Sequence, residues 1–400
     1  GPTGVSGSRI LSEDGYSDNP FGVYNDFQRA FFKTGLNKTL YTSVASGSEK
    51  IKTFFSAETT ENEGILKETE GYKRAGLRLN VDYDILDWLT FKASTNFIRI
   101  VDNSPGGGAG IYRTLTRLNP DSNILAPNPD GQPYYYLPDP WENEITNPLY
   151  SLSVADAKTN QQRFLGSYLV NLKFTNWLNM DVEYAFENNN SRYSSNNKYE
   201  SFTTTGDDIG FGYSKGSLTK NNTYDISQKV QATLNFKKTF DELDVNSKLS
   251  YLAEDQKYDY YSVSGNDYKF KDLPSLDNFD PAYVSANSNQ QSERAQNVFA
   301  IAGLVFKDRY IVDGLFRRDG SSLFGAENRW NNYYRISAAY RISEDINIPG
   351  IQELKINVAK GTSGQRPGFD WQYEQTNLSQ GSLSSVRRKG NPFLKPSLTT

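Results

Sequence analysis

The sequence predicts an all-β protein, namely a transmembrane antiparallel barrel with up-and-down topology. Residues Tyr334 to Ile342 alternate between apolar and polar side chains, which is the period of a strand. Only 36% of the residues are hydrophobic and the mean hydropathy is −0.67, although aromatic residues reach 14%. A barrel wall explains this combination, because only every second strand residue faces lipid and aromatic girdles mark the membrane interfaces.

Composition also excludes several kinds of site. The chain has no Cys and no His, which removes thiol nucleophiles, Cys/His zinc sites, histidine bases and disulfides. A net charge of −4 argues against nucleic-acid binding. The chain contains no run of about 18 apolar residues, so it predicts no transmembrane helix. Acid pairs such as Asp207 and Asp208 are too common in loops to indicate catalysis. We therefore predict no enzyme, no cofactor and no metal site.

Residues 1–36 form a lead-in segment, and residues 37–400 form the predicted barrel portion. The lead-in is rich in Gly, Ser and Asp and becomes amphipathic between Tyr24 and Phe32. We expect it to be a short helix or loop that packs near the barrel rim.

The first predicted strands share one pattern, in which two strands flank a short turn. Strands at 40–46 and 51–60 flank a turn at 47–50. Two further pairs of alternating strands, at 77–83 with 89–97 and at 168–174 with 178–186, each place a tryptophan at the start of the second strand, namely Trp88 and Trp177. An amphipathic indole is typical of the membrane–water boundary, so we predict both as interface residues. A tryptophan in the core of a soluble hairpin is the alternative.

Later strands continue the pattern at 230–236, 243–251, 298–306, 310–316, 334–342 and 354–358. On the strand at 334–342 we predict that Tyr334, Ile336, Ala338 and Tyr340 face lipid, whereas Arg335, Ser337 and Arg341 face the lumen. A slip by one residue would place arginine in hydrocarbon at a cost of about 2–4 kcal/mol. Tyr334 and Tyr340 are the predicted interface aromatics of this strand.

The connections alternate between short and long. We predict that the turns at 84–88, 175–177, 237–242 and 307–309 lie at one end of the sheet, and that the long segments 101–162, 187–223 and 253–296 lie at the other. Outer-membrane barrels have short periplasmic turns and long extracellular loops. About a dozen strands are predicted in total.

Four strings resemble the SusC-like TonB-dependent transporters of Gram-negative outer membranes. They are SGSEK at 46–50, NEGIL at 62–66, RRDGSSLFGAENRW at 317–330 within the matching stretch 306–342, and GNPFLKP at 390–396. The resemblance implies the first half or so of a 22-stranded barrel, with the plug domain and the closing strands outside this chain. It also implies uptake of oligosaccharides or peptides, a SusD-like lipoprotein partner, TonB, and contact with membrane lipid and lipopolysaccharide.

Two other functions remain open from the residues alone. One is a structural or secretion-associated barrel without active import, and the other is a soluble all-β carbohydrate-binding protein. Detergent dependence would separate the soluble protein from both barrels. A plug with a TonB-contacting segment would separate the importer from the passive barrel.

Aromatic side chains in the long segments are the candidate substrate contacts, since flat rings stack on sugars or on peptide side chains. They are Tyr134, Tyr135, Tyr136, Trp141, Tyr260, Tyr261 and Trp371. Packing between loops is the alternative reading. For Arg317, Arg318, Asp319 and Arg329 we predict a structural role, an ion and hydrogen-bond network that holds a loop against the wall.

The end of the chain gives a last prediction. Prolines at 392 and 396 remove the ladder donors that a closing strand would need. The strand near Leu40 and the last strand, at 354–360, should therefore not be hydrogen-bonded to each other.

Overall fold

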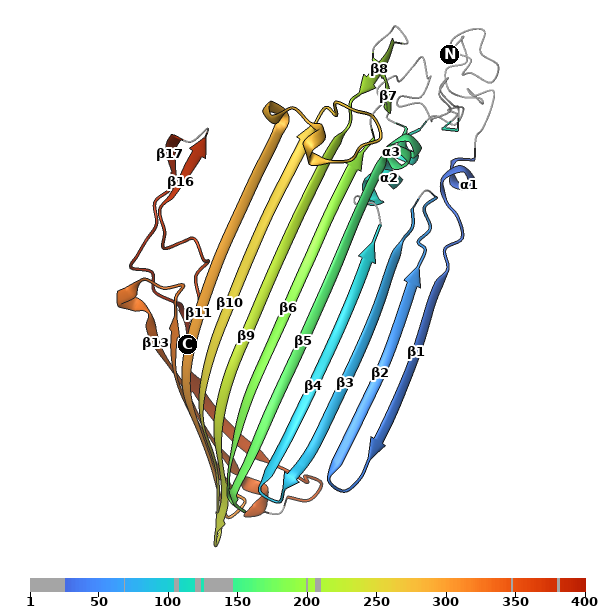
Figure 1. Ribbon diagram of the computed structural model, residues 1–400. Coiled ribbons are helices and arrows are strands. Elements are labelled where there is room, and N and C mark those ends of the chain that lie inside the picture. The colour runs from blue at the N-terminus through green and yellow to red at the C-terminus, as the bar shows by residue number, and fades with distance from the viewer. Residues whose placement is uncertain are drawn as a thin grey trace, which may run out of the picture.

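The computed structural model describes residues 26–67, 69–103, 108–118, 124–125, 147–198, 201–205, 210–346, 348–379 and 382–400. Its main feature is a 12-stranded antiparallel sheet in the order β1-β2-β3-β4-β5-β6-β9-β10-β11-β12-β13-β14. Each strand of this sheet therefore pairs with the next one along the chain. Figure 1 shows the strands slanting side by side in a sheet that curls at β11–β13. The predicted up-and-down antiparallel wall is confirmed.

The strands of the sheet range in length from 7 to 24 residues. Their bounds are β1 (Asn37–Gly47), β2 (Ile51–Asn62), β3 (Tyr72–Leu86), β4 (Leu89–Asp102), β5 (Ala155–Thr175), β6 (Leu178–Asn197), β9 (Ser217–Phe240), β10 (Leu243–Asn266), β11 (Val284–Phe306), β12 (Tyr310–Ser321), β13 (Trp330–Arg341) and β14 (Lys355–Gly361).

Smaller elements lie outside this sheet. Three two-stranded ladders are formed by β7 (Ser201–Thr205) with β8 (Gly210–Ser214), β15 (Ser363–Gln365) with β18 (Ser397–Thr399), and β16 (Gln375–Ser379) with β17 (Ser382–Arg388). The α-helices are α1 (Phe27–Phe31), α2 (Gly108–Leu115) and α3 (Pro148–Val154), and four single 3-10 turns are η1 (Leu276–Asn278), η2 (Pro281–Tyr283), η3 (Ala326–Asn328) and η4 (Ile342–Glu344). None of the described helices is long and apolar enough to cross a membrane.

The short turns all lie at one end of the sheet, as predicted. Tight connections join β1 to β2, β3 to β4, β5 to β6, β9 to β10 and β11 to β12. Because neighbouring strands are antiparallel, the strand ends that border the connections 63–71, 103–154, 198–216, 267–283 and 322–329 lie at the other end. We call the two ends the short-turn end and the long-connection end.

Two of the predicted long loops are wrong in extent. Nearly half of 187–223 and most of 253–296 belong to β6, β9, β10 and β11, which run for 20 to 24 residues. At ~3.3 Å per residue, 24 residues span roughly 80 Å, far more than an apolar band about 25 Å tall requires. These strands carry polar side chains in both phases beyond the band, so alternation gave no signal there. The ladder nevertheless continues without a register shift.

The strands β1 and β14 are the two edges of the sheet, and no ladder of the described residues joins them. The prediction that they are not paired is confirmed.

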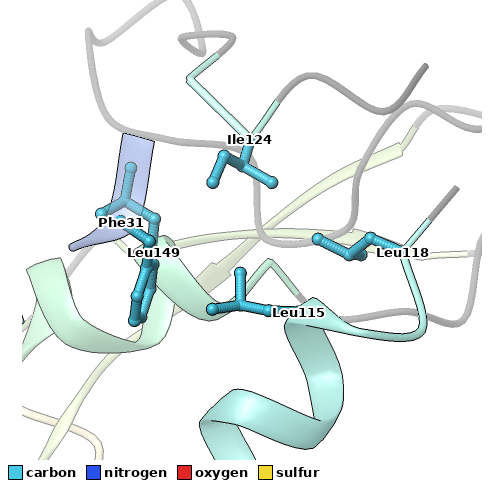
Figure 2. Close-up of a cluster of buried hydrophobic side chains, with 5 residues drawn as sticks. All are labelled: Phe31, Leu115, Leu118, Ile124 and Leu149. Carbon is cyan, nitrogen blue, oxygen red and sulfur yellow. The ribbon is translucent and has the colours of Figure 1, made fainter. Parts of the chain in front are cut away.

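A small apolar cluster lies at the long-connection end, where α1, α2 and α3 meet (Figure 1). Figure 2 shows its five buried side chains, Phe31, Leu115, Leu118, Ile124 and Leu149. Asn147 is fully buried beside it, and its side chain accepts from Leu149 N and donates to Ile124 O, both at 3.0 Å. This bifunctional cap fixes the start of α3. The C-terminal part of the lead-in thus packs at the end where the long connections lie.

Candidate functional site

The two faces of the sheet differ sharply in chemistry. Side chains opposite one another in an antiparallel ladder lie on the same face, so the register assigns a face to each strand residue. Tyr334, Phe316, Ala300, Leu249, Leu234 and Met180 follow one another across six strands and define the apolar face. The next row, Arg335, Leu315, Ile301, Lys248, Asn235 and Asn179, lies on the opposite, polar face.

The register places Arg335 and Ser337 on one face and Tyr334 and Ile336 on the other, which matches the predicted grouping. Arg335 donates to Asp313 at 2.5 Å, and Ser337 hydrogen-bonds the same carboxylate. Tyr334 and Ile336 are 45% and 56% exposed and have no polar surroundings of this kind. That the exposed group faces lipid stays a prediction.

The polar face is densely hydrogen-bonded near the short-turn end. A cavity of about 540 Å³ there is lined by residues that include Lys52, Asp82, Lys92 and Lys173. Lys52 pairs with Asp82 across β2 and β3, and Asp82 pairs with Lys92 across β3 and β4. Such alternation of charge suits contact with a polar surface. An apolar surface in the same place would remove water from the charges, which is energetically costly.

Two amide–carboxylate bonds extend this network across β5, β6 and β9. The carboxylate of Asp181 accepts from the Asn171 amide at 2.7 Å and from the Asn235 amide at 2.8 Å. These bonds hold the side chains in place along the wall.

A second polar region lies higher, toward the long-connection end. Its cavity of about 420 Å³ runs from Arg78 on β3 to Glu254 on β10. Arg163 donates to Glu187 at 2.6 Å, while Glu183 accepts from Ser167 at 2.9 Å. The row of Glu187 is followed, toward the long-connection end, by the next row on the same face. That row consists of Arg163, Asn189, Asp225, Tyr258 and Gln291, which follow one another across five strands. We call this row the inner belt.

The alternation of side chains did not predict the inner belt. A signal was available, because no Gly or Pro occurs between Ser217 and Ser264. A long segment without these residues is unusual for a loop.

Of the predicted arginine network, Arg317 and Asp319 take part and lie in β12 rather than in a loop. Arg317 donates to Asn297 at 2.7 Å and to Asp319 at 3.4 Å. Arg366, far along the chain, reaches the same carboxylate at 2.9 Å and Glu254 at 3.5 Å. Burial opposes the charge on Arg366, but the hydrogen bond and the field of Asp319 outweigh it and raise its pKa.

The other two arginines lie elsewhere. Arg318 is on the apolar face, with its guanidinium 5.2 Å from the ring centre of Trp330. No side-chain hydrogen bond or ion pair within the described residues joins Arg329 to this network. The network therefore ties the segment at 363–366 to β10, β11 and β12, so a structural role remains our proposal for Arg317 and Asp319 only.

Tyr134, Tyr135, Tyr136 and Trp141 lie outside the described residues. Tyr260 and Tyr261 are in strand β10 and not in a loop, so they point to opposite faces. Tyr260 shares the polar face with the inner belt, whereas Tyr261 is on the apolar side and 50% exposed. Trp371 is 48% exposed beside Arg388, whose guanidinium lies 5.9 Å from its ring. The structure does not bring Tyr260, Tyr261 and Trp371 together.

The predicted interface aromatics lie at the edges of the apolar face. Trp177 and Tyr340 are near the short-turn end, where Tyr340 stacks on Tyr310 at 5.2 Å and Trp177 packs edge-on against Phe236 at 5.3 Å. Trp88 occupies the equivalent turn between β3 and β4 and is 52% exposed. Tyr334 lies six residues from Tyr340 on the same face, just below the polar row of Asn332 and Arg318.

Within the described part of the chain, no group of three or more Asp or Glu side chains is arranged to hold a metal ion.

The sequence is similar to those of curated TonB-dependent receptors. The TonB-dependent receptor P39 of Formosa agariphila is 24% identical over 326 residues, covering 80% of this chain and 30% of the receptor. The TonB-dependent receptor SusC of Bacteroides thetaiotaomicron is 23% identical over 387 residues, covering 87% of this chain and 36% of SusC. No family model matches the chain. The chain spans about a third of the length of these curated relatives.

Solved structures agree on the fold. A chain of the RagAB peptide importer in its closed-closed state superposes with a TM-score of 0.76 at 18% identity, covering 94% of this chain and 43% of that one. This chain resembles the SusC-like TonB-dependent transporters. The ferric citrate transporter FecA is more distant, with a TM-score of 0.51 at 9% identity. The chain thus has part of the barrel fold of these proteins, and the matched proteins are named as receptors, importers or transporters, not as enzymes.

Proposed function

We propose that this SusC-like chain forms part of the wall of a TonB-dependent importer in the outer membrane of a Gram-negative bacterium. The observation that carries the proposal is the division of the 12-stranded sheet into one apolar and one polar, hydrogen-bonded face. An apolar face suits lipid on the outside of a barrel and a polar face suits an aqueous lumen. The similarity to SusC and to the RagAB importer supports the same function.

We infer that the importer takes up oligosaccharides or peptides with a SusD-like lipoprotein, and that TonB supplies energy through a plug domain. The polar cavity near the short-turn end, with its alternating lysines and aspartates, offers a surface for such a plug. The apolar face, together with the polar side chains that continue on the same side toward the long-connection end, would contact membrane lipid and lipopolysaccharide. We assign no cofactor and no nucleic-acid partner.

Substrate contact is assigned to the polar face at the level of the inner belt. Tyr258 is the aromatic residue of that row, and Tyr260 is the next aromatic on the same face of β10. Trp371 remains a candidate on the C-terminal segment. Tyr261 is withdrawn, because its side chain is on the face that we assign to the exterior.

The test is uptake by cells that carry the full-length gene. A labelled oligosaccharide and a labelled oligopeptide are supplied to cells with the gene, without it, and with the gene but without TonB. We expect uptake of one probe to require both the gene and TonB. If neither probe depends on them, the import function is wrong and a passive barrel is the better description.

The same assay separates the two faces of β10. Tyr258→Ala should reduce uptake about tenfold if stacking at the inner belt contributes about 1.4 kcal/mol. Tyr261→Ala, a matched change on the same strand, should leave uptake unchanged. Equal effects of both variants would contradict a role for the inner belt in substrate contact.

A further inference from the structure

The apolar face contains a shallow groove between β9 and β13. Its volume is about 720 Å³. The floor includes the small residues Ser247, Ala300, Ala302 and Gly314. The walls include Leu234, Phe236 and Leu249 on one side and Phe316, Tyr334 and Ile336 on the other. The groove exists because β10, β11 and β12 place the small residues Ser247, Ala302 and Gly314 side by side, while β9 and β13 carry Phe236 and Ile336 in the same row.

The groove lies at the depth of hydrocarbon in the proposed membrane orientation. Below it, toward the short-turn end, Phe240, Leu243, Phe306, Tyr310 and Tyr340 form a mostly aromatic row across five strands. Such a row is typical of the membrane interface. Phe236 is only four residues from Phe240, or roughly 13 Å along the strand. A molecule in the groove could therefore reach the interface without leaving the wall.

A lysine stands between the groove and that interface. The Lys238 ammonium lies 5.3 Å from the ring centre of Trp177 and 5.0 Å from that of Phe240. Its direct neighbours on the same face are Val245 and, across the turn region, Leu243. No carboxylate of the described residues forms an ion pair with it. A cation held on two aromatic faces at a membrane boundary is available to an anionic headgroup.

We propose that this surface is a binding site for one phospholipid, with its phosphate on Lys238 and an acyl chain in the groove. The site rests on the proposed outer-membrane location. A flexible chain can fill a narrow floor between apolar walls, and the ammonium complements the charge of the phosphate. Together, the unpaired cation and the adjoining groove favour a phospholipid over a second copy of the chain, which would need a complementary anion beside an apolar ridge.

Filling the groove provides the first test. Gly314→Leu places a side chain directly on the floor, and the backbone tolerates it because a Cβ at Gly314 approaches no atom closer than 3.9 Å, at Arg335 O. Gly303→Leu is the matched control, since Gly303 lies on the polar face of the neighbouring strand and its Cβ would meet only Asn246 O at 3.5 Å.

The full-length protein, purified in detergent, is titrated with phosphatidylglycerol and with phosphatidylcholine of identical chains, and bound lipid is counted by native mass spectrometry. We expect Gly314→Leu to weaken binding of both lipids at least tenfold and Gly303→Leu to leave it unchanged. Retention of lipid by Gly314→Leu at the wild-type level would overturn the site.

Charge provides the second test. Lys238→Gln should weaken binding of phosphatidylglycerol severalfold more than Lys237→Gln, because Lys237 is the adjacent lysine on the polar face. Equal effects of the two substitutions would overturn the assignment of the headgroup. A shift from monomer to dimer that is lost in Gly314→Leu, with no lipid bound to the wild type, would instead identify a second copy as the occupant.

The outer-membrane location is decided separately, by fractionation of cells that produce the full-length protein. Recovery in the outer membrane without specific lipid retention would refute the site alone. Recovery as a soluble protein would refute the proposed function, whatever the micelle titration gives.

Discussion

Strands β9 and β10 each have a lower half, nearer the short-turn end, and an upper half, nearer the long-connection end. The two halves share one continuous ladder but differ in how their side chains are distributed. In the lower half, Leu234 and Leu249 are opposite each other on one face, while Asn235 and Lys248 are opposite each other on the other. In the upper half, Asn222 faces Tyr261 on the first side and Asn221 faces Ser262 on the second. The backbone pairing is the same in both halves, so hydrogen bonds between strands do not require an apolar face. Only the lower half has the amphipathic division that a membrane wall needs.

The largest effect that separates the two halves should come from an isoleucine-to-arginine change on the apolar side. Ile336→Arg lies within the apolar band, where arginine costs about 2–4 kcal/mol, because a guanidinium would be placed in hydrocarbon. Ile226→Arg is on the same side but in the upper half, beside Asn188 and Lys257, and should cost about 0–1 kcal/mol. Urea unfolding of the full-length protein in lipid vesicles measures both. Similar losses would show that the band extends into the upper half.

The next prediction concerns the buried junction above the band. Asp319 is 7% exposed and accepts from Arg317 and Arg366. Asp319→Asn keeps the shape but removes the charge, so we expect a loss of about 1–3 kcal/mol. Hydrogen exchange at 363–366 should accelerate accordingly. Asp370→Asn, which breaks the exposed pair with Arg388, serves as the control and should cost less than about 1 kcal/mol. If both variants leave exchange at 363–366 unchanged, the junction does not hold that segment.

Much of the lower half could be predicted from sequence, because an apolar face opposite a polar one imposes a strict alternation on the side chains. The strands around Leu77, Leu172 and Ile336 follow this rule. The upper halves of β6 and β10 could not be found in this way, since polar side chains on both faces leave no period. Their residues, such as Asn189 and Asp225, resemble a loop in composition although they form a regular ladder.

The candidate site was harder to predict than the fold, since it depends on contacts between distant segments. Arg366 reaches Glu254 over 112 positions of sequence, and no local pattern reveals such a pair. The segments 317–330 and 390–396 are also in contact, and no local pattern reveals that contact either. Asn328 donates to Phe393 O at 3.2 Å, and Gly325 leaves no room for a Cβ beside Pro392. The connection 322–329 thus packs against the segment 390–396.

A smaller effect is expected at the connection 267–283, which closes over the upper ends of β9 and β10. Phe279 is 4% exposed and packs with Leu218 and Tyr268 directly on Gly265, where an added Cβ would lie 2.3 Å from the Phe279 ring. Gly265→Ala should therefore displace Phe279 at a cost of about 1–3 kcal/mol to local stability. Faster hydrogen exchange at 267–283 would report it. Gly303→Ala, where the nearest atom is 3.5 Å away, is the control, and equal exchange in both variants would rule out this packing.

The smallest effect is a pH dependence of the same connection. Burial raises the pKa of Tyr268 above its ordinary value of 10.0, because the tyrosinate would lose its hydration. The folded pKa is therefore higher than the unfolded one, so the contribution of Tyr268 is complete below pH 10 and is lost as pH rises through the folded pKa. Cleavage within 267–283 by an alkaline protease should increase across that range. Tyr268→Phe also loses the hydrogen bond to Asn196 at 2.8 Å, so its cleavage should be faster at pH 9 but should lack the additional alkaline step. An alkaline step of the same size in both proteins would assign it to another group, since phenylalanine cannot ionise.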